Sequence, residues 1–224
     1  MINSAGIIGT GAYLPNKKLN NSDLGKICDM PGKEILKKTG IKFRRIAEKK
    51  ETASSMGLKA SLLAIKNSKL NKKEIEMVIC CSFSGEYIYP ALACKISQLL
   101  ELDDPGCFDV MANCTGFQTG LDIAFDKIKT SKSLKNILVV AVAMQSRYID
   151  WRDKNSAIYF GDGASAAIVS KVKKNYGHLG CSLISNTKVF DAVRMRGGGS
   201  SFVTSNYLKQ KNNQKYEISG LEVW

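Results

Sequence analysis

The chain has 224 residues, of which 44% are hydrophobic and 24% charged, so it is long enough to bury a substantial core as a soluble globular protein. Its longest apolar run is far shorter than the roughly 20 residues that cross a bilayer, and its first residues lack the basic and apolar segments of a secretory signal. Lysine and arginine outnumber aspartate and glutamate by 33 to 20, which gives a net charge of +13 and favours an acidic partner.

The chain opens with a strand-like run from Gly6 to Pro15, whose glycines Gly9 and Gly11 we interpret as turn residues. A dinucleotide-binding fingerprint needs a helix directly after such glycines, and Pro15 interrupts any helix, so we discount a bound dinucleotide. The next element, 52–67, carries small residues every three to four positions. This stripe predicts a buried helix that lies close against a sheet.

Two continuous apolar runs, 76–81 and 136–143, are typical of parallel strands that are covered on both faces. Helices are expected around 90–100 and from Cys114, where apolar residues recur at helical spacing. Further strands are predicted at four places: near Phe108, within 157–169, at 180–185 and from Tyr216. The alternation of strands and helices predicts an α/β layered domain.

Cys114 stands where a strand-like run ends and a helix begins, in Asp109-Val-Met-Ala-Asn-Cys-Thr-Gly-Phe117. Unpaired backbone N–H groups and the positive end of a helix dipole favour an anion there, so we expect a reactive thiolate. A free cysteine more often packs as a small hydrophobe, and we interpret the other six in this way. They are Cys28, Cys80, Cys81, Cys94, Cys107 and Cys181. An odd number of cysteines without a CxxC pair indicates a reducing cytoplasm and no metal site.

Three stretches resemble, in order and spacing, the β-ketoacyl-acyl carrier protein synthase III family of thiolase-fold condensing enzymes. They are Gly6–Pro15, Asp109–Phe117 and Phe160–Ala167, with supporting matches at Lys38–Ile41, Tyr89–Cys94 and Gly197–Ser200. The resemblance implies an α/β, thiolase-like layered fold, αβαβα in the complete family. This chain would hold the N-terminal half-domain, 1–172, and a truncated start of the second half, 173–224. A shortened protein, a split gene and a cut fragment are the alternatives.

The resemblance implies that Cys114 accepts an acyl group from an acyl-CoA or acyl-ACP thioester, with its own backbone N–H as one oxyanion donor. In the complete enzyme, decarboxylative Claisen condensation with malonyl-ACP follows, in fatty acid or related lipid and polyketide synthesis. The implied partners are an acyl carrier protein, acyl-CoA and a second subunit in a homodimer or heterodimer; no cofactor besides the thioester substrate is implied. A non-catalytic partner subunit or an inactive truncated fragment is the alternative.

Five further positions match the family's substrate pocket or dimer contact. They are Tyr89, Phe117, Gly161, Asp162 and Gly163. The strand 137–143 matches the one that pairs across the family dimer. Because the family's decarboxylating histidine and asparagine lie beyond the matched part, we expect this chain to be acylated at most. The single histidine, His178, stands elsewhere in the motif order, so we interpret it as a structural or surface residue.

Binding of the coenzyme A nucleotide is implied at Lys38 and Lys154, where the family has two arginines. Glu34 stands where the family has a tryptophan that stacks on the adenine. Lysine keeps the charge of arginine but not its planar fork, so the usual clamp on coenzyme A is weakened and both acyl donors stay open. No zinc finger, helix-turn-helix or RNA-binding aromatic signature accompanies the basic charge, so we expect no nucleic-acid or membrane partner.

Overall fold

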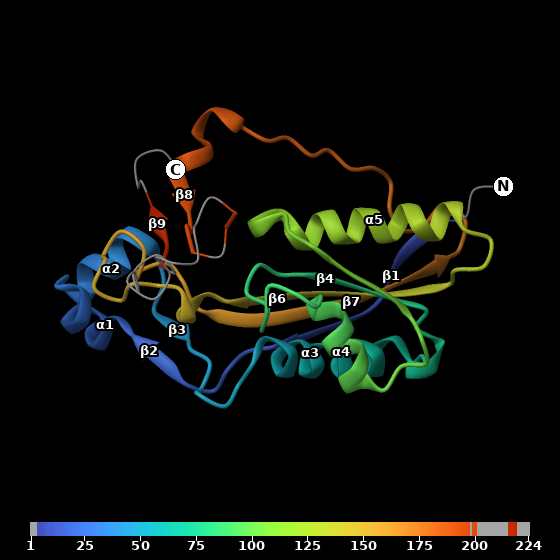
Figure 1. Cartoon of the computed structure of the whole chain (residues 1–224), viewed down its shortest axis with the longest axis horizontal. Coiled ribbons are helices and arrows are strands. Elements are labelled where there is room, and N and C mark those ends of the chain that lie inside the picture. Colours follow the sequence, from blue (N-terminus) through green and yellow to red (C-terminus); the bar gives the residue numbers. More distant parts are fainter. Residues whose placement is uncertain (1–3, 198, 201–214, 219–224) are drawn as a thin grey trace. The chain divides into compact units, whose positions relative to one another are not determined.

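The computed structural model describes residues 4–197, 199–200 and 215–218 of the chain (Figure 1). They divide into two compact units, each with its own core. Unit 1 consists of Met1–Pro15, Ala47–Met144 and Gly163–Ser182, and unit 2 consists of Asn16–Ile46, Gln145–Asp162 and Leu183–Trp224. Among the described residues, no helix combines the length and apolarity that a bilayer crossing requires. The expected division of the chain into 1–172 and 173–224 refers to the two halves of the complete family fold, and it stays a prediction.

Unit 1 is built on a five-stranded mixed sheet with the order β1-β7-β6-β4-β5. The strands are β1 (Ser4–Tyr13), β4 (Met77–Cys81), β5 (Gly106–Val110), β6 (Asn136–Met144) and β7 (Asp162–Val172). Strand β4 is parallel to both β5 and β6, as the continuous apolar runs predict, and β1 is antiparallel to β7. The mixed α/β character expected from the sequence is therefore confirmed.

Helices cover both faces of this sheet (Figure 1). They are α3 (Ala53–Ser68), α4 (Leu92–Leu100) and α5 (Gly116–Thr130), with short 3-10 turns at η1 (Lys72–Glu74) and η2 (Asn113–Thr115). Helices α3 and α4 enclose one core with the sheet, and α5 encloses a second core on the opposite face. The three helices predicted in this region are all confirmed.

The interpretation of Gly9 and Gly11 as turn residues is wrong, because both lie inside β1. A Cβ on Gly11 would stand 2.2 Å from the carbonyl oxygen of Ala60, and one on Gly9 would stand 2.5 Å from that of Ala64. Real Cβ atoms do not approach a carbonyl so closely. The two glycines therefore form the surface on which α3 lies, and the predicted stripe of small helical residues forms the other side of this contact.

Strand β6 lies inside the sheet, with β7 on one side and β4 on the other. A strand whose two edges are both paired cannot extend the sheet into a second subunit, so the assignment of 137–143 to the dimer contact is wrong. The strand expected at 180–185 is also absent. These residues are exposed, and the described part of the chain gives them no neighbouring strand to take up their hydrogen bonds.

Unit 2 combines short elements from segments that lie far apart in the sequence. They are β2 (Lys18–Asn20), α1 (Asn21–Cys28), α2 (Gly32–Thr39), β3 (Phe43–Arg45), η3 (Gln145–Arg147), η4 (Thr187–Ala192), β8 (Val193–Arg194) and β9 (Glu217–Ile218). Strand β2 pairs with β3, and β8 pairs with β9, both antiparallel. The strand predicted from Tyr216 is thus confirmed at β9, whereas part of the glycine-rich stretch 197–201 lies outside the described residues.

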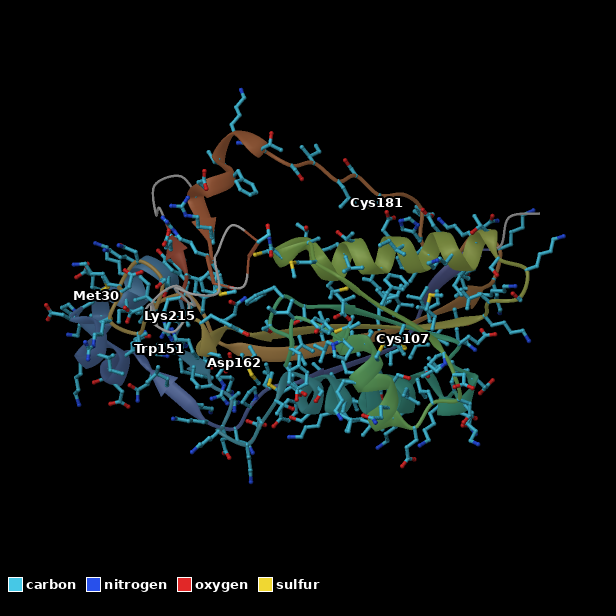
Figure 2. The ribbon with its side chains drawn as sticks, in the orientation of Figure 1. Met30, Cys107, Trp151, Asp162, Cys181 and Lys215 are labelled. Atoms are coloured by element: carbon cyan, nitrogen blue, oxygen red, sulfur yellow. The ribbon has the colours of Figure 1, made fainter. Side chains whose placement is uncertain are left out.

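The core of unit 2 joins α1 and α2 to the segment 145–162. Leu24 and Ile35 are fully buried against Ile149 and Ile158, and Figure 2 labels two further members, Met30 and Trp151. Burying these apolar side chains is the main favourable term that holds the segments together.

A buried arginine, Arg44, joins the same segments through polar contacts. It is 3% exposed, and its guanidinium donates hydrogen bonds to the carbonyl oxygen of Ile158 and to the side-chain oxygen of Asn21. Asn21 in turn donates to the carbonyl oxygen of Ile41 at 2.7 Å. Arg44 therefore links β3, the start of α1 and the segment 145–162.

Candidate functional site

Cys114 lies in the 3-10 turn η2, directly before the fifteen-residue helix α5. Strand β5 ends at Val110, so the expected passage from strand to helix is confirmed at this point. The cysteine side chain is exposed, and the residue before it, Asn113, has a positive φ of 46°. Few side chains adopt that conformation, and asparagine tolerates it better than most. The turn therefore presents the thiol at the N-terminal end of the helix.

Two glycines let the first turns of α5 lie directly against β4. A Cβ on Gly120 would stand 2.4 Å from Sγ of Cys81, and one on Gly116 would stand 3.4 Å from Cβ of Cys81. Burial raises the pKa of the Cys81 thiol to about 11, and the nearby Asp109 charge adds to the rise. Cys81 thus stays protonated at neutral pH and packs as a small apolar side chain, as predicted. The Gly-x-x-x-Gly spacing is the sequence signal for this approach, and sequence reasoning missed it.

Asp109, the carboxylate of the cysteine motif, caps α4. Its two oxygens accept hydrogen bonds from the backbone N–H groups of Leu92 and Ala93, at 2.6 Å and 2.8 Å. The N-cap residue of α4 is Ala91, which has no side chain to fill this role. A carboxylate at a helix N-terminus also interacts favourably with the helix dipole. Asp109 therefore fixes α4 against the end of β5, a role that the linear motif did not indicate.

The loop that carries Tyr89 is anchored at both ends. Before it, Glu86 accepts hydrogen bonds from the backbone N–H of Ser54, at 3.2 Å, and from the Ser54 hydroxyl. After it, α4 is held by Asp109. Between these anchors, the side chains of Tyr87–Tyr89 are 71–84% exposed. Exposed apolar side chains on a fixed backbone are typical of a contact surface, while the assignment of Tyr89 to the substrate pocket or dimer contact stays a prediction.

The Gly-Asp-Gly stretch forms a packed corner. Asp162 is 4% exposed, and its Oδ1 accepts a hydrogen bond from the backbone N–H of Ser146 at 2.8 Å; Figure 2 labels it. A Cβ on Gly161 would stand 3.0 Å from the carbonyl oxygen of Arg45. These contacts support a structural role. Phe117 is half-buried in the core beneath α5, and Gly163 lies in β7.

The two lysines implied in nucleotide binding belong to unit 2, whereas Cys114 belongs to unit 1. Nζ of Lys38 lies 3.0 Å from a carboxylate oxygen of Glu34, one helical turn away, and both side chains are about half exposed. Exposed pairs of this kind contribute at most about 1 kcal/mol, so an anion can compete for the lysine. Lys154 is exposed. Glu34, which stands where the family has a tryptophan, thus partly neutralises the positive charge of Lys38.

The single histidine has the contacts of a structural residue. The ring of His178 stacks on Phe125 with centroids 4.5 Å apart, and its Nδ1 lies 2.8 Å from Nζ of Lys129. Its Nε2 lies 3.5 Å from a carboxylate oxygen of Asp122, and its backbone N–H donates to Ala5. These contacts hold the segment after β7 against α5 and β1 within unit 1, in agreement with the structural interpretation.

The interpretation of six cysteines as packing residues is correct for only part of the set. Cys28, Cys80 and Cys81 are buried, but Cys94 and Cys181 are exposed and Cys107 is intermediate. Cys94 lies on the exposed face of α4, next to the buried Leu92 and Ala93, and the sequence of this short helix did not show which face meets the sheet. Among the described residues, no group of three or more histidine, cysteine, aspartate or glutamate side chains could hold a metal ion.

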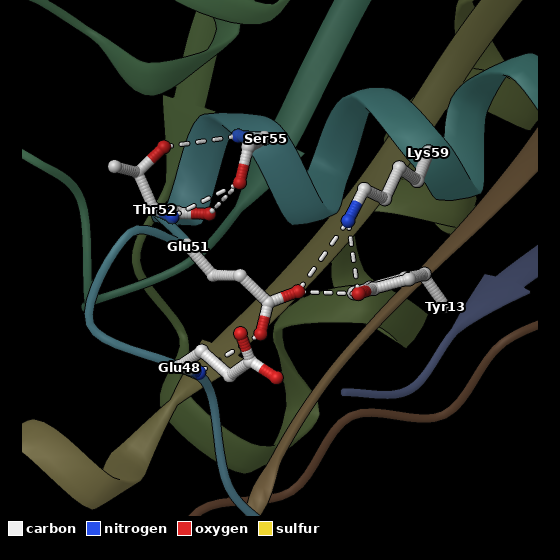
Figure 3. A network of polar contacts seen from close by, with 6 residues as sticks. All are labelled: Tyr13, Glu48, Glu51, Thr52, Ser55 and Lys59. Atoms are coloured by element: carbon white, nitrogen blue, oxygen red, sulfur yellow. Dashed lines mark hydrogen bonds and ion pairs between the residues drawn. The ribbon is translucent and has the colours of Figure 1, made fainter. Parts of the chain in front are cut away.

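A polar network at the start of α3 was also missed (Figure 3). Glu51 is 8% exposed; it accepts hydrogen bonds from the Tyr13 hydroxyl and from the backbone N–H of Glu48, the latter at 2.9 Å. Nζ of Lys59 lies 3.4 Å from the same carboxylate and 4.1 Å from the centre of the Tyr13 ring. Burial raises the pKa of Glu51, but the hydrogen bonds from Tyr13, Glu48 and Lys59 outweigh it and hold this pKa below the ordinary value.

Comparison with known proteins agrees with this arrangement. The family model described as 3-oxoacyl-[acyl-carrier-protein (ACP)] synthase III matches residues 108–187. A β-ketoacyl-[acyl-carrier-protein] synthase III of Fusobacterium nucleatum is 38% identical over 96% of this chain and 65% of its own length. The β-ketoacyl-[acyl-carrier-protein] synthase III of Clostridioides difficile is 34% identical over 100% of this chain and 68% of its own length.

Solved structures give the same result for the fold. The priming β-ketosynthase of the R1128 polyketide biosynthetic pathway superposes with a TM-score of 0.88 at 28% identity, over 99% of this chain and 65% of that one. The thiolase-like layered fold that the motifs implied is therefore confirmed. The chain spans about two thirds of the length of the curated relatives it matches. With 34% identity to a relative of which it covers 68%, the chain belongs to the β-ketoacyl-[acyl-carrier-protein] synthase III family.

Proposed function

We propose that the chain is an acyltransferase in which Cys114 takes an acyl group from a thioester. The thiolate sulfur adds to the carbonyl carbon to give a tetrahedral oxyanion. The bond to the donor sulfur then breaks, and the donor leaves as a thiolate that takes up a proton from water. The observation that carries the proposal is an exposed cysteine in the turn that leads into α5. The positive end of the α5 dipole favours the anionic sulfur, and the N–H of Cys114 would donate to the oxyanion.

In the full length of the family fold, we propose that the acyl-enzyme condenses with malonyl-ACP, in fatty acid or related lipid and polyketide synthesis. The names of the relatives support this reaction class. The acyl carrier protein is the proposed partner, and no cofactor besides the thioester substrate is proposed. The unpaired state of all seven cysteines supports a reducing compartment, which we propose to be the cytoplasm.

Acyl transfer is tested by mass spectrometry of the intact chain after incubation with an acyl-pantetheine thioester. We expect one acyl adduct, which hydroxylamine removes and which Cys114→Ala abolishes. Because Cys94 and Cys181 are also exposed, Cys94→Ala and Cys181→Ala are matched controls and should keep the adduct. A folded chain that stays unacylated, or an adduct that survives in Cys114→Ala, would reject the nucleophile assignment and favour a non-catalytic role.

For the acyl donor, we propose that the Glu34–Lys38 pair lowers the preference for coenzyme A. The carboxylate competes with a nucleotide phosphate for the same ammonium group, and no aromatic face is present at position 34. Glu34→Gln should therefore speed acylation by acyl-CoA and leave acylation by acyl-pantetheine unchanged, because pantetheine lacks the nucleotide. Lys38→Ala should slow only the acyl-CoA reaction. Equal effects on both donors would contradict this role.

We also propose a homodimer, with β5 in place of the misassigned strand as the element that meets the second copy. Within the described part of the chain, β5 pairs only with β4, so one of its edges is available. The exposed Tyr87–Tyr89 and Met111, which is 75% exposed, belong to the same unit. Light scattering should give twice the chain mass. Asp or Lys substitutions in Tyr87–Tyr89 should shift the protein toward the monomer, and a lone stable monomer of the unchanged chain would contradict the proposal.

A further inference from the structure

Helix α4 and strand β5 bring two cysteines of unit 1 together. The hydrogen bonds from the backbone N–H groups of Leu92 and Ala93 to Asp109, at 2.6 Å and 2.8 Å, hold the first turn of α4 against β5. Cys94 follows directly in that turn. Cys107 precedes Asp109 by two residues on the strand, and alternate residues of a strand point to the same face. The two cysteines therefore lie on opposite sides of the contact between α4 and β5.

The Cys107 thiol lies on the side of β5 that meets α4. It donates a hydrogen bond to the carbonyl oxygen of Pro105 at 3.5 Å, and the side chains of Ser97 and Cys94 on α4 are among the neighbours that influence its pKa. Cys107, labelled in Figure 2, packs against the core on the α3 and α4 side of the sheet and is half-buried, whereas Cys94 is exposed. One thiol is thus open to solvent and the second lies behind it. Close approach of the two side chains is the first requirement of a disulfide.

We propose that Cys94 and Cys107 form a reversible disulfide when the folded chain meets peroxide. The Cys94 thiolate attacks one peroxide oxygen and becomes a sulfenic acid, and hydroxide leaves. The Cys107 sulfur then attacks the Cys94 sulfur, the S–O bond breaks, and the proton of Cys107 leaves with the oxygen as water. In total, two thiols and one hydrogen peroxide give one disulfide and two water molecules. A dithiol reductant returns both thiols by exchange.

The positions of the two residues assign their roles. Burial raises the pKa of Cys107, so its thiol stays protonated at neutral pH and reacts after Cys94, which solvent reaches first. The cross-link would join α4 to β5 beside the Asp109 cap. Strand β5 leads through Val110 into the turn that carries Cys114. Oxidation would therefore fasten the base of that turn without using Cys114, independently of acyl transfer.

The test is a disulfide map of the folded, unmodified chain. Hydrogen peroxide is added in an equimolar amount, free thiols are blocked with N-ethylmaleimide, and the chain is cut after Lys95 by trypsin and before Asp109 by a protease specific for aspartate. These cuts place Cys94, Cys107 and Cys114 on separate peptides. We expect a peptide pair joined through Cys94 and Cys107, two hydrogen atoms lighter than the separate peptides and absent after dithiothreitol.

The controls separate this pair from the other exposed thiols. Cys94→Ser and Cys107→Ser should each lose the cross-link, whereas Cys114→Ala and Cys181→Ala should keep it. Because the map is made on the unchanged chain, its result does not depend on how the variants fold. Independent oxidation or blocking of Cys94 and Cys107, or a dominant link from Cys94 to any other cysteine, would overturn the proposal.

Discussion

Replacing Gly120 with alanine tests how α5 is placed to present Cys114. The new Cβ would stand 2.4 Å from Sγ of Cys81 and 3.2 Å from a methyl carbon of Val139, both in a closely packed core. Overpacking typically costs about 1–3 kcal/mol, and a contact as short as 2.4 Å places this site in the upper part of that range, at about 2–3 kcal/mol, whereas alanine gains about 1 kcal/mol over glycine inside a helix. We expect a net loss of about 1–2 kcal/mol in the free energy of unfolding, and a Tm lower by roughly 2–8 °C for a chain of this length.

Urea unfolding measures the change in stability. The rate of Cys114 acylation measures the effect of moving α5 away from β4. Cys81→Ala removes the clashing sulfur, so Gly120→Ala should cost less in that background than in the unchanged chain. Gly180→Ala is the matched control, because no atom lies within 4 Å of its added Cβ, and it should leave stability unchanged. Full additivity of the two substitutions, or a Gly120→Ala chain as stable as the original, would refute the argument from close approach.

Three further substitutions test the polar contacts. Glu51→Gln removes a carboxylate whose pKa is held below its ordinary value of 4.5. The ionised carboxylate stabilises the folded chain above pH 4.5, and this stabilisation is lost as the pH falls through the lowered pKa. The urea midpoint of the variant should therefore fall less steeply in acid than that of the unchanged chain, and an equal slope would contradict the network with Tyr13. Arg44→Met should lower the free energy of unfolding by about 2–3 kcal/mol, because the carbonyl of Ile158 loses its buried donor; an unchanged urea midpoint would contradict that role. Asp109→Ala should cost about 1–2 kcal/mol and speed hydrogen exchange at the first amides of α4, and unchanged exchange there would show that the cap does not hold the helix.

Elements with a clear apolar pattern could be predicted from the sequence, because a helix with one buried face requires a helical period and a strand covered on both faces requires a continuous apolar run. The helices α3 and α5 and the strands β4 and β6 are the examples. Partners far along the chain could not be predicted. A glycine permits either a turn or a close contact, and only the position of α3 shows that Gly9 and Gly11 serve the contact.

The same reason explains the errors around the candidate site. The position of Cys114 follows from local order alone, whereas the role of Asp109 depends on a helix N-terminus 17 residues away in the sequence. The central place of β6 is a matter of strand order, which no local pattern records. Exposure of Cys94 likewise depends on which face of α4 meets the sheet. The chemical character of single positions could therefore be predicted from the sequence, but the contacts between elements could not.

The discontinuity of unit 2 has a consequence for biosynthesis. Arg44 and its acceptor Ile158 are 114 residues apart in the sequence, an interval that a ribosome adding about 5–20 residues per second needs about 6–23 s to translate. During this time the nascent helices α1 and α2 have none of the apolar side chains of 145–162 to cover them. A holdase that binds nascent chains would meet the first 46 residues in this exposed form, while the intervening strands and helices of unit 1 are still leaving the exit tunnel.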